Sequence, residues 1–132
     1  TRCFKPEIRE WMEPAMRRII DGVAQAFGAE IEFDYLYRYP PTINHPAETS
    51  IAAKIAAEVA GESRVDTDTD PVMGGEDFAF MLEKVPGCYL FIGNGAGEGV
   101  CMVHNPDYDF NDEILPVGAT YFSRLVESVL PT

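Results

Sequence analysis

The residue with the clearest potential for chemistry is His104, because of the residues around it. It lies in the run Val103-His104-Asn105-Pro106-Asp107-Tyr108-Asp109-Phe110-Asn111-Asp112. Imidazole is a common metal ligand and acid–base group. The Asn-Pro pair fixes the chain just after the histidine, and the neighbouring carboxylates are available to orient its ring. From these residues alone, His104 is either a ligand or catalytic group or an ordinary surface histidine, and the choice stays open.

Other candidate motifs fit their chemistry less well. The glycine-rich residues 93–99 follow a predicted strand, but the GxGxxG spacing fails at Glu98 in one register and at Val100 in the other. No amphipathic helix follows to offer its N-terminus to a phosphate. The acidic runs 66–70 and 107–111 resemble calcium loops, but both lack the glycine that an EF-hand turn requires. We interpret all three segments as surface loops.

The remaining histidine and the cysteines are interpreted as ordinary residues. His45 precedes Pro46 near the start of a predicted helix, where a lone histidine is usually a surface or satisfied group. Cys3, Cys88 and Cys101 are odd in number and have no CxxC spacing. This argues against a disulfide framework and predicts a reducing, cytoplasmic environment.

Composition narrows the classes of partner. The 132 residues are 46% hydrophobic, enough for one domain or parts of two, and the formal net charge is −12. Lys and Arg are few and scattered, so we expect neither nucleic acid nor an anionic membrane surface as a partner. No apolar run approaches the roughly 20 residues of a membrane span. The first residues have no signal-peptide pattern and no initiator Met, so we expect the chain to begin inside a larger protein.

The apolar periodicity predicts an α/β chain. Three- and four-residue steps indicate a helix over about 6–27, which Pro14 should kink or divide and Gly28 should cap. Further helices are predicted over about 46–60, from Glu76-Asp77 as an acidic first turn, and from about 113–116 onward. Alternating or continuous apolar residues predict strands at 2–4, 31–39, 64–67 and 88–92. Pro40-Pro41 reads as a domain boundary or hinge.

Two long motifs resemble a known family. Residues 71–79, Pro-Val-Met-Gly-Gly-Glu-Asp-Phe-Ala, and residues 104–112 together resemble the hippurate hydrolase and N-acyl-amino-acid amidohydrolase family, in the clan of aminoacylases and carboxypeptidase G. Residues 39–44, Tyr-Pro-Pro-Thr-Ile-Asn, are similar to the hinge of that family. The resemblance covers nearly the whole chain, in the right order.

The resemblance implies an architecture for the chain. The family has an α/β catalytic domain interrupted by a smaller lid domain, which often dimerises. Residues 1–39 would then be the second half of a small α+β lid, and residues 40–132 the C-terminal part of the α/β metallohydrolase catalytic domain. We therefore expect a homodimer formed through the lid. This division agrees with the boundary that Pro40-Pro41 predicts.

The resemblance also implies a function. The family cleaves the amide bond of N-acyl amino acids or small peptide-like substrates with a water activated by two divalent metal ions, for which Zn or Mn is compatible. His104 maps onto one metal ligand, while Asn44, Gly74, Gly75 and Glu76 map near the substrate. No catalytic residue maps onto this chain, and the Cys-x-His pair, the Glu-Glu pair and a second family-type His are absent. We expect the missing N-terminal part to supply them, and the isolated chain to be inactive.

A non-catalytic alternative stays open. The chain could instead be an acidic α/β association module, because the ligands are incomplete and half a lid would leave strand edges exposed.

Overall fold

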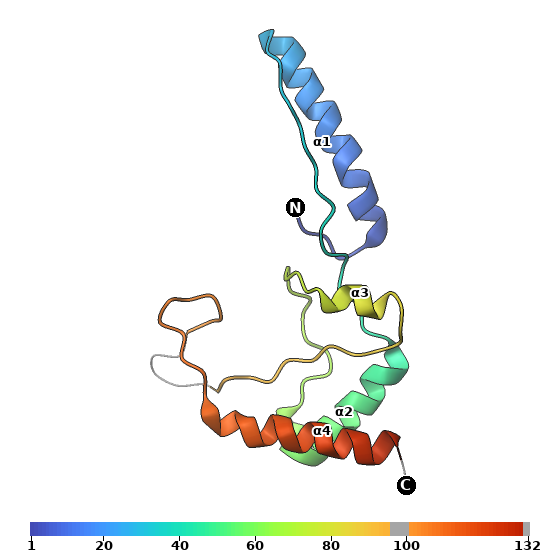
Figure 1. Ribbon diagram of the computed structural model, residues 1–132, viewed down its shortest axis with the longest axis vertical. Helices are drawn as coiled ribbons and strands as arrows, with labels where there is room; N and C mark the ends of the chain where they lie inside the picture. Colours follow the sequence, from blue (N-terminus) through green and yellow to red (C-terminus); the bar gives the residue numbers. More distant parts are fainter. Residues whose placement is uncertain (96–100, 131–132) are drawn as a thin grey trace. The chain divides into compact units, whose positions relative to one another are not determined.

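The computed structural model describes residues 1–95 and 101–130, which form helices joined by extended chain (Figure 1). The helices, in chain order, are α1 (Pro6–Phe27), α2 (Pro46–Ala60), the 3-10 turn η1 (Glu62–Arg64), α3 (Phe78–Leu82), the 3-10 turn η2 (Asp112–Ile114) and α4 (Leu115–Val129). No helix in this described part has the length and hydropathy of a membrane span.

The chain divides into two compact units, each built from two stretches of sequence. The first unit comprises Thr1–His45 and Asp70–Gly87, and the second comprises Pro46–Thr69 and Cys88–Thr132. The proposed division into lid residues 1–39 and catalytic residues 40–132 concerns domains of a larger protein, and it stays a prediction.

Helix α1 begins and ends where the sequence predicts. A proline occupies its first turn, where the missing N–H costs nothing, and Gly28 ends it with a left-handed φ of 61°. Pro14 does not divide this helix, because α1 runs from Pro6 to Phe27, and the alternative that Pro14 kinks it stays a prediction. Pro14 is exposed, so water can bond the carbonyl group that loses its helical partner.

The extended residues 31–39 run back along α1 (Figure 1). The guanidinium carbon of Arg17 lies 5.2 Å from the ring centroid of Phe33, and that of Arg9 lies 5.1 Å from the ring of Tyr37. The Tyr37 hydroxyl donates a hydrogen bond of 2.9 Å to the Glu13 carboxylate. The alternating aromatic side chains thus face the helix, as a period of two requires.

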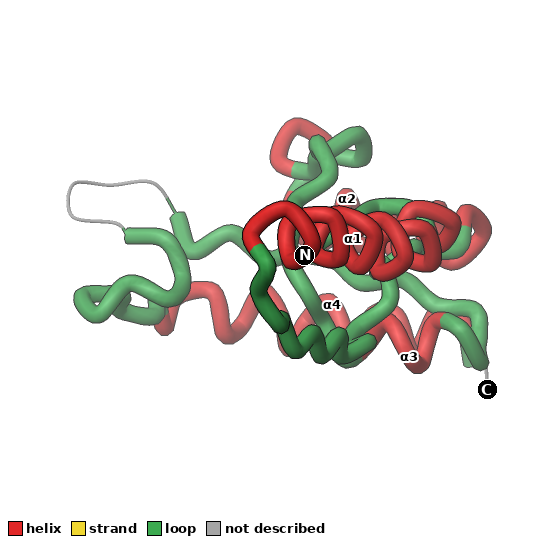
Figure 2. Tube along the Cα trace, turned by 90° about the horizontal axis from the view of Figure 1, so that it is seen from above, coloured by secondary structure: helices red, strands yellow, loops and turns green. Residues whose placement is uncertain are grey.

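The four predicted strands are not formed in the described residues, and Figure 2 shows helices and loops there. Residues 2–4, 31–39, 64–67 and 88–92 carry no strand, and Arg64 ends the 3-10 turn η1 instead. A strand is defined by a hydrogen-bonded neighbour, and none of these segments pairs with another. The α/β class is therefore not confirmed here, although the helices that it needs are present.

The second unit is held by the packing of α2 against α4. Ile55 of α2 is 1% exposed and Tyr121 of α4 is 5% exposed. Residues 88–92 pack against α4, because a Cβ added at Gly118 of that helix would lie 3.5 Å from the Ile92 Cδ1 atom. Burial raises the pKa of the Tyr121 hydroxyl, and the nearby Cys88 thiol adds to that shift. An apolar contact between two helices and one extended segment is thus the core of this unit.

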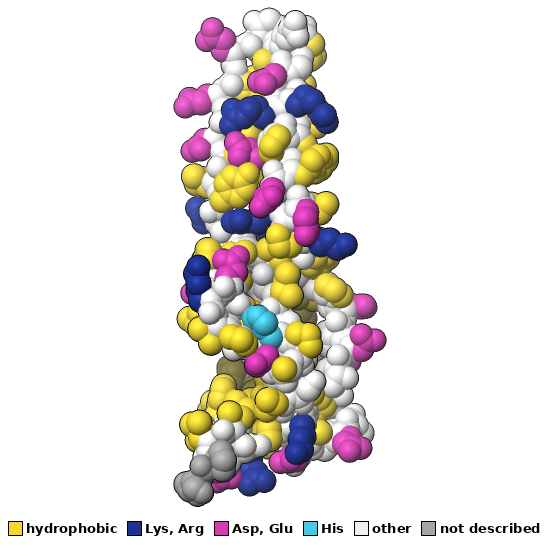
Figure 3. All heavy atoms as spheres, turned by 90° about the vertical axis from the view of Figure 1, so that its right-hand side faces the viewer, with side chains coloured by type: hydrophobic (Ala, Val, Ile, Leu, Met, Phe, Trp, Pro, Cys, Tyr) yellow, Lys and Arg dark blue, Asp and Glu magenta, His cyan; other side chains and the backbone are white. Residues whose placement is uncertain are grey.

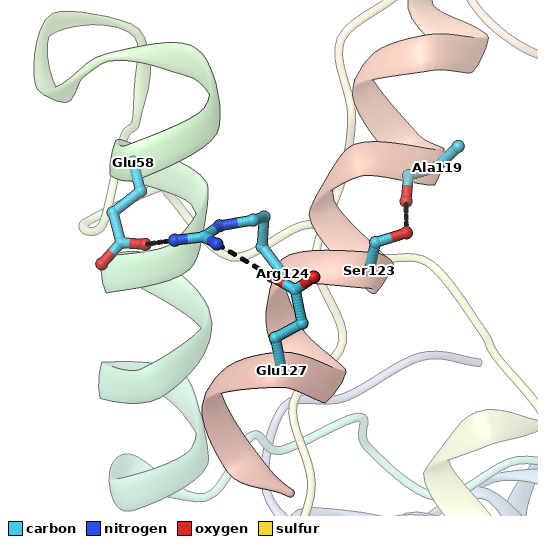
Figure 4. Close-up of polar contacts among 5 residues, drawn as sticks. All are labelled: Glu58, Ala119, Ser123, Arg124 and Glu127. Atoms are coloured by element: carbon cyan, nitrogen blue, oxygen red, sulfur yellow. Dashed lines mark hydrogen bonds and ion pairs between the residues drawn. The ribbon is translucent and has the colours of Figure 1, made fainter. Parts of the chain in front are cut away.

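One charged contact joins the same two helices. Arg124 of α4 pairs with Glu58 of α2 at 3.6 Å and with Glu127 on its own helix at 2.8 Å (Figure 4). All three side chains are exposed, and such pairs contribute about 0–1 kcal/mol. A buried Ile contributes more, about 1.5–3 kcal/mol, so apolar burial dominates this contact.

Large apolar side chains remain exposed in both units. Helix α1 exposes Ile8, Trp11 and Ile19, with Trp11 at 62%. Helix α4 exposes one whole apolar face, formed by Leu115, Phe122, Val126 and Val129. Figure 3 shows hydrophobic side chains spread among charged ones over the face in view. Surface of this kind is typical of segments that pack against further protein.

We predict that Ile55→Ala destabilises the chain by about 2–5 kcal/mol, and Ile55→Val by about 0.5–1.5 kcal/mol, because the substitution leaves a cavity between α2 and α4. Urea unfolding followed by circular dichroism measures both changes. Ile51→Ala is the matched control, since Ile51 lies one turn earlier on α2 and is 42% exposed. An equal loss at both positions would contradict the packing described.

We also predict that Arg17→Met and Tyr37→Phe each move the pKa of Glu13 back toward its usual 4.5. Hydrogen bonds from Arg17, and then from Tyr37, hold that pKa below the usual value. The carboxylate is therefore favoured in the folded state, and its contribution to stability is present above about pH 4.5 and lost as the pH falls through the folded pKa.

Carbon-detected NMR of the Glu13 carboxyl during a pH titration measures this shift. Tyr35→Phe is the control, because the Tyr35 hydroxyl bonds Thr1 rather than Glu13. A Glu13 pKa that does not respond to Arg17→Met or to Tyr37→Phe would show that these bonds are not formed in solution.

Candidate functional site

His104 sits in a tight turn of the second unit. The N–H of Asn105 donates to the carbonyl oxygen of Met102 at 3.2 Å, which closes the turn around the histidine. His104 has a φ of 70°, the one positive φ of a residue other than glycine in the described part of the chain. Its side chain is exposed. The turn therefore presents the imidazole to solvent on a backbone conformation that few side chains adopt.

The residues after His104 are fixed by local hydrogen bonds. The Asn105 side-chain oxygen accepts from the N–H of Asp107 at 2.9 Å, and its carbonyl oxygen accepts from the N–H of Tyr108 at 3.0 Å. The Cys101 thiol donates to the Asp107 carbonyl oxygen at 3.4 Å. These bonds form an Asx turn of the type that Asn-Pro sequences favour. The Asn-Pro-Asp run thus constrains the chain beside His104, as its residue types predict.

Two asparagines, Asn94 and Asn111, join the ends of the segment that carries His104. The backbone N–H of Asn111 donates to the Asn94 side-chain oxygen at 2.8 Å, and the Asn94 amide donates to the Asp109 carbonyl oxygen at 2.9 Å. The sequence prediction missed both residues. The available signal was the position of Asn111 just before a helix, where asparagine is a preferred N-cap.

The residues predicted near the substrate all belong to the first unit. Asn44 and Glu76 are half-buried, and Gly74 is exposed with open space where a Cβ would stand. At Gly75 a Cβ would collide with the Arg2 guanidinium and would lie 3.4 Å from the Tyr39 ring. Gly75 therefore permits a close approach of Arg2 that a larger residue would prevent.

His45 lies in the first unit and is a satisfied histidine, as its context predicts. The Nδ1 atom of its ring accepts a hydrogen bond of 3.2 Å from the backbone N–H of Gly87, and the backbone N–H of His45 donates to the Gly87 carbonyl oxygen at 3.0 Å. These two bonds join the hinge residue after Asn44 to Gly87, in the stretch of chain beyond α3. They position the chain beside one predicted substrate residue.

The described residues do not by themselves make a metal site. No group of three or more His, Cys, Asp or Glu side chains close enough to hold an ion occurs among residues 1–95 and 101–130. A hydrolytic metal needs about three protein ligands and a water. His104 can be one ligand of such a set, but a second and third would have to come from elsewhere. The glycine-rich residues 96–100 lie outside the described residues, and so does that part of the predicted surface loop.

Several curated proteins that are similar in sequence to this chain are hydrolases. The chain is 36% identical over 132 residues to the N-acetylcysteine deacetylase of Bacillus subtilis (strain 168), covering 99% of this chain and 33% of that protein. It is 32% identical over 124 residues to the hippurate hydrolase of Campylobacter jejuni, covering 94% of this chain and 32% of that protein. Thermostable carboxypeptidase 1 of Saccharolobus solfataricus is 30% identical over 121 residues, which cover 89% of this chain and 30% of that protein.

The chain thus spans about a third of the length of the curated relatives that it matches. No solved structure shows a significant match to it. The model of one protein family, described as peptidase family M20/M25/M40, matches residues 5–128, which is nearly the whole chain. This agrees with the resemblance carried by the motifs at 71–79 and 104–112, and the chain belongs to peptidase family M20/M25/M40.

Proposed function

We propose that this chain is the C-terminal part of a metal-dependent amidohydrolase that cleaves the amide bond of N-acyl amino acids. Membership of the peptidase family supports amide hydrolysis. Two relatives are named hippurate hydrolase and N-acetylcysteine deacetylase, and both names denote hydrolysis of the amide bond of an N-acyl amino acid. N-acyl amino acids, of which hippurate is one, are the substrate class that both names share.

The observation that carries the proposal is the backbone of His104. A non-glycine residue with φ of 70° costs about 1–2 kcal/mol relative to an ordinary conformation. Such strain persists where the surrounding structure holds it, and it concentrates at functional sites. Here the turn from Met102 to Asn105 and the Asx turn after it hold the histidine with its ring exposed. A metal ligand explains why a histidine rather than a glycine occupies this position.

The residues described contribute one ligand, His104, to a site that would hold two divalent ions, Zn or Mn. When bound, two such ions lower the pKa of a bridging water and polarise the scissile carbonyl. The other ligands and the general base would come from protein beyond these 132 residues, since the relatives are about three times as long. Asn44, Gly74, Gly75 and Glu76 are proposed to contact the substrate, with Gly75 keeping the Arg2 guanidinium close to the chain.

We propose the domain division that the family resemblance implies. Residues 1–39 would form half of a lid, and residues 40–132 part of the catalytic domain. The exposed Ile8, Trp11 and Ile19 of α1 support a homodimer formed through the lid. The lack of CxxC spacing among Cys3, Cys88 and Cys101 is compatible with a reducing cytoplasm.

The alternative function is a non-catalytic association module. The exposed apolar faces of α1 and α4 favour it, as does the lack of a three-ligand cluster in the described residues. Light scattering tests this alternative: a well-behaved monomer would remove its main support, whereas self-association agrees with both functions, because the lid is also proposed to dimerise.

We predict that the purified 132-residue chain, supplied with Zn²⁺ or Mn²⁺, does not hydrolyse hippurate or N-acetylcysteine, because one imidazole cannot hold a hydrolytic metal. Chromatographic assay of released benzoate or acetate measures this. Metal-dependent turnover by the chain alone would contradict the incomplete site.

The companion experiment joins the chain to the sequence encoded immediately upstream of Thr1. We expect metal-dependent activity that His104→Ala abolishes and that Ser123→Ala, on the exposed surface of α4, leaves unchanged. Full activity in the His104→Ala protein would remove His104 from the site.

We also predict that His104→Gly raises the free energy of unfolding of the chain relative to His104→Ala by about 1 kcal/mol, because glycine adopts a positive φ without strain. Urea unfolding of the two variants measures the difference. Asp109→Gly against Asp109→Ala is the control pair, since Asp109 has no positive φ and glycine should be the less stable there. A stability order of Ala above Gly at position 104 would show that the strained turn does not form in solution.

A further inference from the structure

The segment that carries His104 is closed at its base by a pair of asparagines. Asn94 follows the apolar residues 88–92, which lie on α4, and Asn111 precedes η2. Their side chains bond backbone groups across a separation of 15 to 17 residues in sequence. The contact between the two asparagines is part-buried.

The polar atoms of this pair are used almost completely. The Asn94 side-chain oxygen accepts from the Asn111 N–H at 2.8 Å, and the Asn94 amide donates to the Asp109 carbonyl oxygen at 2.9 Å. The Asn111 amide donates to the Asn94 carbonyl oxygen at 3.3 Å, and its side-chain oxygen accepts from the Glu113 N–H at 3.0 Å. Both residues are thus bonded to backbone groups, which fixes the path of the chain rather than its charge.

These bonds connect the His104 turn to the core of the second unit on two sides. Through Asn94, residues 109–111 are joined to the extended segment that packs on α4. Through the bond to Glu113, Asn111 caps η2, which leads directly into α4. Within this stretch, backbone hydrogen bonds also join Asn105 to Met102 and Tyr108 to Asn105. His104 is therefore presented on a short segment whose C-terminal end is held in place twice.

We propose that Asn94 and Asn111 are positioning residues for His104: they hold the base of its segment so that the strained backbone turn presents the imidazole in one direction. The role in metal binding rests on the proposed function, whereas the effect on the backbone of His104 does not. The two asparagines bond backbone groups and not the imidazole, so the effect expected first is on the backbone conformation of His104.

The test uses NMR of the 132-residue chain and four variants. Asn94→Ala removes both side-chain bonds of Asn94. Asn94→Asp keeps the acceptor for the Asn111 N–H and loses the donor to Asp109. Asn111→Asp keeps the cap on Glu113, since aspartate caps as well as asparagine does, and loses the donor to Asn94. Ser123→Ala, on the exposed side of α4, is the control.

Two readouts are followed in each variant. The first is the set of backbone shifts of His104 and Asn105 without metal, which report the positive φ. The second is the change in the His104 ring signals during titration with Zn²⁺ alone, and His45, the other histidine of the chain, is the internal reference. The signals of Ile55 and Tyr121 report the packing of α2 on α4.

The proposal expects Asn94→Ala to shift the His104 backbone signals most, with intermediate shifts in the two aspartate variants and none in Ser123→Ala. Ile55 and Tyr121 should not change. Any Zn²⁺ response of His104 should be weakest in Asn94→Ala, and the order of the variants should be the same.

Two results would overturn the proposal. In the first, the His104 backbone signals are the same in Asn94→Ala as in the wild type. In the second, the Ile55 and Tyr121 signals move as much as those of His104, which would make the pair a general structural feature. A wild-type His104 that ignores Zn²⁺ while the Asn94→Ala backbone shifts persist would support positioning, because the other metal ligands are proposed to lie beyond these 132 residues.

Discussion

Burial of apolar surface between α2 and α4 is the interaction on which the second unit depends. Ile55 is the one large side chain that is fully buried among the described residues, and Tyr121 is the buried residue of α4. The ion pair of Arg124 with Glu58 spans these helices on their exposed side, where charges stabilise little. Residues 88–92 lead from this core to Asn94, which bonds Asn111. The position of the fixed end of the His104 segment therefore depends on the same core.

The helices could be predicted from sequence because their signals are local. The proline at the start of α1, the left-handed Gly28 at its end and the periodic apolar residues between them all act within a few turns. Pro14 shows the limit of the same rules, since an exposed proline removes one hydrogen bond without ending the helix. The strands could not be predicted with the same certainty. The alternation in residues 31–39 indicates which face of the segment is apolar, but it does not indicate whether a neighbouring strand is present to pair with it.

The local structure around His104 was predictable to a similar extent. A sequence motif singled out His104, and the turn chemistry of Asn105-Pro106 agrees with the hydrogen bonds that surround it. Asn94 and Asn111 were not predictable, because their bonds join residues that lie 17 apart and depend on where the chain folds back. Nor does sequence periodicity show that the apolar face of α4 that includes Phe122 and Val126 is exposed here, while Tyr121 is buried.

The central claim is that His104 binds a metal ion once this segment is joined to the rest of its protein. The most direct measurement is anomalous X-ray diffraction at the zinc or manganese edge from crystals of the natural full-length polypeptide. We expect an anomalous peak about 2.0–2.1 Å from a ring nitrogen of His104, with further ligands from outside these 132 residues. Metal ions bound elsewhere, with the His104 ring free in solvent, would contradict the account.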